Sequence, residues 1–114
     1  MKIYVGHSRK FNFKEELYEP LKKLDHDFTF PHKNSDEPFN SNEFLKTCDL
    51  MIAEVSFPST GLGIEIGWAD LLNIPIIFIH KKGSKISGSL KVMKGKFIEY
   101  TTEDLIEKIK KEIN

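Results

Sequence analysis

The chain has 114 residues, 39% of them hydrophobic and 30% charged, which is enough for one compact domain and excludes a two-domain architecture. We therefore expect residues 1–114 to form a single domain. Seventeen basic and 17 acidic side chains give a formal net charge of zero, so no overall positive field favours a nucleic acid as partner. The charges are uneven, because residues 1–80 carry 8 basic and 12 acidic side chains whereas residues 81–114 carry 9 and 5.

A single cysteine, Cys48, forms neither an intrachain disulfide nor a zinc site by itself, which fits a reducing compartment. The apolar run at residues 1–5 is too short for a signal peptide, and no run approaches the roughly 20 apolar residues of a membrane span. No His, Cys or carboxylate side chains stand at the spacing of metal ligands. We expect a cytoplasmic protein that needs no metal, no cofactor and no membrane.

Short apolar runs alternate with segments of helical spacing along the chain. The runs predict strands at residues 3–5, 28–30, 50–55, 75–79 and 97–100. The segments between them predict helices at residues 12–24, 41–45, 64–72 and 87–93, and from about 102 onward. This alternation is typical of a parallel sheet with crossover helices. The predicted fold is an α/β three-layer sandwich with a five-stranded parallel sheet, flavodoxin-like or Rossmann-like.

Local signals refine the ends of the first two helices. Asn12 is expected to cap the first helix, and Pro20 inside it predicts a kink. Residues 32–40 are expected to form a polar surface loop, after which Asn40 or Ser41 is expected to cap the second helix. We expect this helix to be short.

The most informative stretch follows the strand at residues 50–55. Ser59 and two glycines, Gly61 and Gly63, lie in an expected loop before a helix that begins at Ile64. Glycines allow a ligand to approach the backbone closely, and a hydroxyl beside a helix start favours an anion. The stretch is neither a P-loop nor a complete dinucleotide fingerprint, because no Gly-Lys-Ser/Thr follows and the third glycine is missing. It predicts binding of a small anion.

Glu65 lies in the first turn of that expected helix. It is equally an ordinary first-turn acid stabilised by the helix macrodipole, and its position alone does not decide. The polar loop before it and Gly67 after it favour a carboxylate that points into the same cleft as the hydroxyls. The helix N-terminus is expected to keep this carboxylate ionised, which suits a nucleophile more than a general acid.

Three segments, residues 3–8, 48–55 and 58–67, resemble the nucleoside 2-deoxyribosyltransferase family, and most of all its 2'-deoxynucleoside 5'-phosphate N-hydrolase branch. The similarity follows nearly the whole chain in the order of its elements. It implies that Glu65 attacks C1' of the sugar, expels the base and forms a covalent glycosyl-enzyme. Such a step passes through an oxocarbenium-like state that a nearby carboxylate stabilises, as in retaining glycosidases.

The resemblance also implies a binding site for the 5'-phosphate. In the hydrolase branch three serines bind this group, and they correspond here to Ser8, Ser59 and Ser89. The family draws the last of them from a partner subunit, so a homodimer is implied. Tyr4 matches a tyrosine at the end of the first strand and is assigned a catalytic role beside Glu65, and Arg9 or Lys10 lies where the branch has an arginine. The backbone of Gly6, Gly61 and Gly63 is assigned to substrate binding with them.

One position departs from the family pattern. The family carries an acidic residue, usually aspartate, that orients the ligand and handles the proton of the leaving base, and the corresponding position here is Ser41. Asp36, Glu43 or His32 from the same region are candidates to replace it. We assign Ser41 to substrate binding.

The remaining candidates are weaker. His7 and His32 lie at strand ends, where they serve in proton transfer or are ordinary hydrogen-bonded groups. Trp68 is expected in the core, whereas Phe11 or Phe39 is in position to cover a base. Lysines near Ser89 attract a phosphate or are simply solvated, and they stand at positions 81, 82, 85, 91, 94 and 96.

The sequence thus predicts an N-glycosidase of nucleoside 5'-monophosphates, with the deoxyribonucleotides favoured. A deoxyribosyltransferase on free nucleosides is the nearest alternative. The serine at position 41 leaves open a nucleotide-binding module without turnover, and the fold alone is compatible with a pure interaction domain.

Overall fold

The computed structural model describes residues 1–33 and 41–113 and centres on one five-stranded sheet. Its strand order is β2-β1-β3-β4-β5, and all neighbouring strands are parallel. The strands are β1 (Lys2–His7), β2 (Asp27–Thr29), β3 (Leu50–Glu54), β4 (Ile76–Lys81) and β5 (Lys96–Tyr100). This order is that of flavodoxin-like sheets, so the predicted fold class is confirmed.

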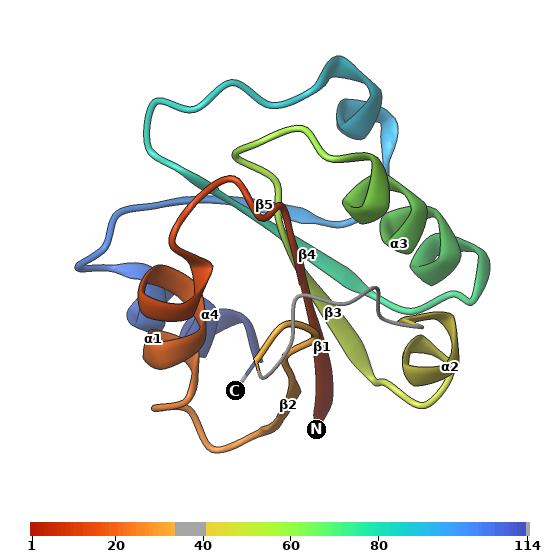
Figure 1. Cartoon of the computed structure of the whole chain (residues 1–114), viewed down its shortest axis with the longest axis horizontal. Coiled ribbons are helices and arrows are strands. Elements are labelled where there is room, and N and C mark those ends of the chain that lie inside the picture. Colours follow the sequence, from red (N-terminus) through yellow and green to blue (C-terminus); the bar gives the residue numbers. More distant parts are fainter. Residues whose placement is uncertain (34–40, 114) are drawn as a thin grey trace.

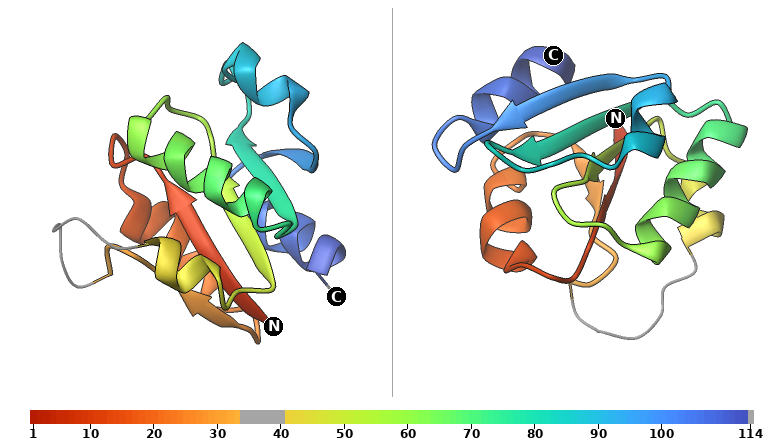
Figure 2. Two further views of the ribbon diagram at one scale, coloured as in Figure 1. Left: turned by 90° about the vertical axis from the view of Figure 1, so that its right-hand side faces the viewer. Right: turned by 90° about the horizontal axis from the view of Figure 1, so that it is seen from above.

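Helices cover both faces of the sheet (Figure 1). A π-helical turn (Lys14–Tyr18) continued by α1 (Glu19–Leu21) lies with α4 (Leu105–Ile113) on one face. The other face carries α2 (Ser41–Leu45) and α3 (Thr60–Leu71), and a 3₁₀ turn (Gly88–Val92) joins β4 to β5. Figure 2 shows the three layers from above, with the sheet between the two helical layers.

Alternation along the strands divides the buried side chains into two cores. Ile3 and Val5 of β1 pack under α1 and α4, whereas Tyr4 between them points to the face of α2 and α3. Every residue of β3 is buried. A strand covered on both faces reads as a continuous apolar run, which is why the strand over 50–55 was predictable.

The first helix differs from its prediction. Its π-helical turn has Phe13 as N-cap and no side-chain cap, and Asn12 contributes only its carbonyl, which accepts the Glu16 N–H at 2.9 Å. Asn12 therefore does not cap the helix, contrary to the prediction. Pro20 stands at the start of α1, but α1 continues the π-helical turn, so the missing N–H of Pro20 removes one hydrogen bond of a continuous helical segment. In place of the predicted kink at Pro20, the helix has a π-helical turn just before it.

The third helix begins four residues before the predicted start at Ile64. Ser59 is its N-cap, with φ −154° and ψ 131°, and its side chain accepts the Leu62 N–H at 3.4 Å. Gly61 and Gly63 therefore lie within the helix and not in a loop. Two glycines weaken a helix by about 1 kcal/mol each, but the serine cap and the burial of Leu62 against the sheet offset that loss.

The strand order also indicates where a ligand binds. It reverses direction between β1 and β3, and in such sheets the crevice beyond the carboxyl ends of these two strands receives the ligand. Residues 8–10 follow β1 there, and residues 56–59 follow β3. Among the described residues no helix has the length and apolar character that a membrane crossing requires.

Candidate active site

A cleft of about 930 Å³ opens at this carboxyl edge. Five segments line it: residues 7–10 after β1, His32 after β2, Ser41 at the start of α2, residues 58–65 with Trp68, and Ser87, Ser89 and Leu90. A smaller hollow of about 510 Å³ lies at the amino edge of the sheet, beside the first residues of β3, β4 and β5. None of the predicted site residues lines that hollow, so the chemistry is to be sought in the larger cleft.

Glu65 is the carboxylate in the cleft wall, and two hydroxyls hold it. The hydroxyl of Tyr4, fully buried in β1, donates to Glu65 Oε2. The side chain of Ser41, 3% exposed, donates its one proton in a second hydrogen bond to Glu65. Tyr4, Ser41 and Glu65 come from β1, α2 and α3, and we call them the Glu65 cluster.

Burial dominates the electrostatics of the Glu65 cluster. Burial raises the pKa of the Glu65 carboxyl above its usual value, while hydrogen bonds from Tyr4 and Ser41 and the charge of His32 act in the opposite direction. Because Glu65 stands in the second turn of α3, the expectation of a first-turn acid kept ionised by the helix end is wrong. Burial and the neighbouring carboxylate raise the pKa of Tyr4, so its hydroxyl remains a donor at neutral pH.

Gly6 lets helix and strand approach each other beside this carboxylate. A Cβ atom on Gly6 would lie 2.6 Å from Met51 Cε, 3.0 Å from Leu62 Cδ1 and 3.3 Å from Glu65 Oε1. No other residue leaves this space, so Gly6 fixes how deeply Glu65 sits against the sheet. The missing side chain of Gly6 thus leaves space on β1 for the Glu65 carboxylate.

The three serines of the predicted phosphate site, Ser8, Ser59 and Ser89, all line the cleft, and so does Arg9. Ser8 is buried, and its Oγ accepts the Lys10 N–H at 3.1 Å. Ser89 is exposed on the 3₁₀ turn of the same chain. We call Ser8, Ser59 and Ser89 the phosphate cradle; the homodimer that would bring Ser89 from a partner stays a prediction.

His7 is a buried, hydrogen-bonded histidine in the cleft wall. Its Nδ1–H donates to the Ser8 carbonyl at 2.8 Å, so Nε2 accepts the hydroxyl of Tyr18. The Tyr18 oxygen also accepts the backbone N–H of His32 at 3.2 Å. Burial lowers the pKa of His7 to about 4, so a neutral His7 orders the wall while His32 faces the cleft.

No family model matches the chain. Two curated proteins match part of it, one from Syntrophotalea carbinolica at 43% identity over 42 residues and one from Methanococcoides burtonii at 43% over 47 residues. Both bear the provisional name 2'-deoxynucleoside 5'-phosphate N-hydrolase 1. The matched segments cover 37% and 41% of this chain, but only 30% and 38% of the relatives' own length.

Solved structures share the fold over nearly the whole chain. A CMP N-glycosidase from Clostridium botulinum has a TM-score of 0.71 at 22% identity, covering 96% of this chain and 99% of its own. A 2-deoxyribosyltransferase from Bacillus psychrosaccharolyticus has 0.68 at 20% identity, covering 93% and 90%. At such identities each structure by itself establishes the fold alone. Together, the curated and structural matches support the nucleoside deoxyribosyltransferase family.

Ser41 stands where the resemblance to the nucleoside deoxyribosyltransferase family leads us to expect an acid, and its hydroxyl binds the carboxylate that an acid would repel. Of the three proposed replacements, Asp36 lies outside the described residues. Glu43 is exposed, pairs with Lys46 at 3.6 Å and does not line the cleft. His32 lines the cleft and is the replacement that the geometry favours.

The aromatic residues follow the sequence interpretation only in part. Trp68 packs against the core as expected, but it is half-buried and also lines the cleft one helical turn beyond Glu65. Phe11, expected to cover a base, instead stacks on Phe57 at 5.5 Å and does not line the cleft. Phe39 lies outside the described residues. The spacing of three residues between Glu65 and Trp68 was the signal that pointed to a shared helix face.

Few basic residues of the chain line the cleft. The lysines near Ser89 do not line the cleft; Lys81 pairs with Glu16, and Lys94 and Lys96 lie at the amino-edge hollow. In the part of the chain that the structure describes, no group of three or more His, Cys, Asp or Glu side chains is placed to hold a metal ion. Positive charge in the cleft comes from Arg9 and Lys10.

Proposed function

We propose that this chain is an N-glycosidase of nucleoside 5'-monophosphates, with Glu65 as the nucleophile. One observation carries the proposal: a carboxylate held by two hydroxyls lies in the wall of the cleft that Ser8 and Ser59 also line. The curated relatives named as nucleotide N-hydrolases and the CMP N-glycosidase of the same fold support this choice.

The chemistry proceeds in two displacements. The bond between C1' and the base nitrogen breaks with its electron pair on the base, and a Glu65 oxygen forms a bond to C1'. Water then attacks C1', the ester bond to Glu65 breaks, and the sugar phosphate leaves as the water loses a proton. Both steps pass through an oxocarbenium-like state, which the carboxylate stabilises at short range.

The Glu65 cluster adjusts its carboxylate for this role. A nucleophile has to be ionised, and burial opposes ionisation of Glu65. The donors from Tyr4 and Ser41 stabilise the charged form and also fix the orientation of the carboxylate. The two donors thus favour the ionised, nucleophilic form of a partly desolvated carboxylate.

The departing base needs a proton or a hydrogen-bond donor. His32 lines the cleft, and its charge is felt by Glu65 in the α3 wall. An imidazole is the side chain best suited to proton transfer near neutral pH. We assign this role to His32, in place of the acid that Ser41 lacks.

The phosphate cradle supplies the specificity for a monophosphate. The Ser59 Oγ accepts a backbone N–H of α3 and keeps its own proton for donation to a phosphate oxygen. The N-terminus of the twelve-residue α3 adds backbone N–H groups and the positive end of its dipole. Arg9 and Lys10 contribute charge from the β1 side.

The test is release of base from a panel of monophosphates (dAMP, dGMP, dCMP, dTMP, dUMP and CMP), followed by HPLC. We expect release from at least one of them by the wild type and a loss of at least about 10³-fold in Glu65→Ala. Glu43→Ala removes an exposed glutamate of α2 and is the matched control, which should keep full activity. No base released from any monophosphate by folded wild-type protein would overturn the proposal.

Transfer to a second base is a further outcome that the 2-deoxyribosyltransferase of the same fold favours. The covalent sugar on Glu65 is the same in both reactions, and only the acceptor differs. Addition of a free base during turnover separates them. A new nucleoside formed equally well with and without a 5'-phosphate would identify a transferase.

A further inference from the structure

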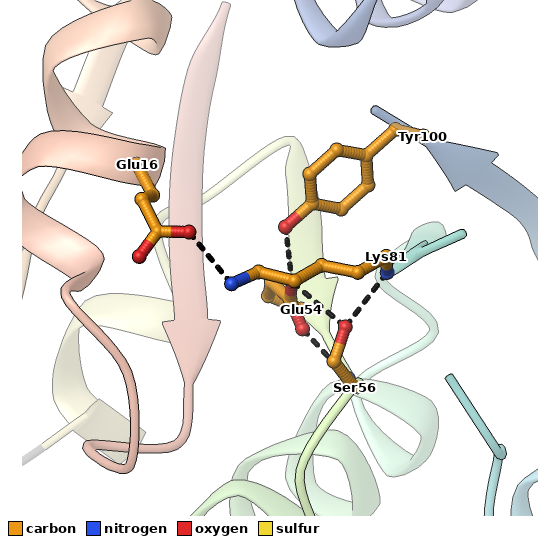
Figure 3. A network of polar contacts seen from close by, with 5 residues as sticks. All are labelled: Glu16, Glu54, Ser56, Lys81 and Tyr100. Atoms are coloured by element: carbon orange, nitrogen blue, oxygen red, sulfur yellow. Dashed lines mark hydrogen bonds and ion pairs between the residues drawn. The ribbon is translucent and has the colours of Figure 1, made fainter. Parts of the chain in front are cut away.

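A second buried carboxylate lies at the carboxyl edge of the sheet and takes no part in the proposed chemistry. Glu54, the last residue of β3, is 0% exposed. Its Oε1 accepts the Ser56 N–H at 2.6 Å, and its Oε2 accepts the Ser56 hydroxyl at 3.0 Å and the hydroxyl of Tyr100. Figure 3 shows these donors around the one carboxylate. Three donors fix its orientation.

Ser56 extends this network to the neighbouring strand. Its hydroxyl donates its only proton to Glu54, so its lone pairs are left to accept the Lys81 N–H, at 2.7 Å. The Lys81 side chain is held in turn by an ion pair of 2.6 Å with Glu16 (Figure 3) and by the Phe11 ring, 4.7 Å from its Nζ. Ser56 is thereby tied to β3, β4 and β5.

The turn anchored at Ser56 is the one that leads into the cleft. Ser59 follows three residues later, caps α3 and lines the cleft. Between the two, Phe57 stacks on Phe11, and Pro58 has a restricted φ. A turn fixed at its start, stiffened in its middle and continued by a helix has little freedom in where it places the Ser59 hydroxyl.

We infer that Glu54 is a positioning residue for the phosphate cradle. Its carboxylate holds the turn over residues 56–59 so that the Ser59 hydroxyl and the first N–H groups of α3 meet the 5'-phosphate. This inference rests on the proposed function, because it takes Ser59 as a phosphate ligand. It differs from a purely structural role, since it predicts that substrates with and without a phosphate respond differently to changes at Glu54.

Glu54→Gln replaces one carboxylate oxygen by an amide NH₂, which then faces a donor. We expect the ratio of kcat/KM for a nucleoside 5'-monophosphate to that for the matching nucleoside to fall about tenfold, through KM, as for loss of one charge-assisted hydrogen bond. Tyr100→Phe keeps the ring and removes one donor, so its ratio should fall about threefold. Glu16→Gln breaks the outer ion pair alone and should leave the ratio unchanged.

The experiment measures these ratios, together with calorimetric binding of 2-deoxyribose 5-phosphate, in wild type, Glu54→Gln, Tyr100→Phe, Glu16→Gln and Ser59→Ala. A lower phosphate preference in Ser59→Ala, Glu54→Gln and Tyr100→Phe, with Glu16→Gln unchanged, supports the inference. Suppose instead that Ser59→Ala lowers the phosphate preference, whereas Glu54→Gln and Tyr100→Phe lower kcat/KM equally for the monophosphate and the nucleoside, or for neither. Glu54 then has a purely structural role and the inference fails, while the proposed function stands. If wild type neither prefers monophosphates nor binds 2-deoxyribose 5-phosphate, both fail. Should Glu54→Gln not fold, Tyr100→Phe decides.

Discussion

Two glutamates at the carboxyl edge of the sheet accept a hydrogen bond from a buried tyrosine, and they lie on opposite faces. Glu65 accepts from Tyr4 on the face of α2 and α3, and Glu54 accepts from Tyr100 on the face of α1 and α4. The donor and acceptor types are the same in both pairs. The surroundings differ, because Glu54 is enclosed whereas Glu65 stands in the wall of the cleft.

The two carboxylates differ in whether a ligand can reach them. Around Glu54, donors from Ser56 and Tyr100 occupy both oxygens, so the group holds the turn and meets no ligand. Glu65 has donors on the protein side and the cleft on the other, where an electrophilic carbon can reach it. This open side supports the nucleophile role that we propose for Glu65, and the tyrosine orients the carboxylate in both cases.

The largest expected difference between the two sites is in stability. Glu54→Ala leaves the Ser56 N–H and the Tyr100 hydroxyl without an acceptor in the core, and we expect the free energy of unfolding to fall by about 3 kcal/mol. Glu65→Ala should lower it by less than about 1 kcal/mol, because water in the open cleft replaces the carboxylate and accepts the Tyr4 hydroxyl. Urea unfolding at pH 7 measures both, and equal losses would show that the two carboxylates are alike.

The third tyrosine, Tyr18, is bonded to a histidine and not to a glutamate. Tyr18 donates to His7, whose pKa burial lowers to about 4 from an ordinary 6.5. A histidine kept neutral in the fold but protonated in the unfolded chain stabilises the fold above pH 6.5, and this is lost as the pH falls toward 4. The loss amounts to about 3 kcal/mol at most.

His7→Gln tests this, because an amide can replace both hydrogen bonds but does not titrate. The wild type should lose more stability than the variant between pH 7 and pH 4, by about 2 to 3 kcal/mol in urea unfolding. Subtracting the two curves removes the contribution of the carboxylates. Parallel curves would mean that His7 is protonated in the folded protein as readily as in the unfolded chain.

The strands were predictable from the sequence because apolar runs are a local property. The five strands followed from their hydrophobic runs, and the switch point brought Ser8, Ser59 and Glu65 to one cleft. The start of α3 was mispredicted because two glycines resemble a loop, whereas the Ser59 cap and the buried Leu62 decide otherwise.

The Glu54 network was beyond the sequence for a different reason. Glu54 reads as one polar residue in an apolar strand, and its partner Tyr100 is 46 residues away. Their contact depends on the register of three strands, in which Glu54 lies beside Ile79 and Tyr100 beside Lys81. No local pattern encodes such a pairing. The contact of Ser41 with Glu65 escaped for the same reason, since it requires α2 and α3 to pack together.

The smallest expected effect concerns the pH at which Glu65 becomes active. The Ser41 hydrogen bond favours the charged carboxylate and lowers its pKa against the effect of burial. Ser41→Ala removes that bond, so the pKa of Glu65 rises further, and the acidic limb of the kcat/KM profile should move to higher pH by about 0.5 unit. Rates of variant and wild type should converge on the plateau, where Glu65 is ionised in both. If the acidic limb of the profile stays in place while the plateau value of kcat/KM falls, Ser41 acts on the substrate and not on the carboxylate. In that case Tyr4 is the one hydroxyl that orients Glu65, as Tyr100 is one of the donors that orient Glu54.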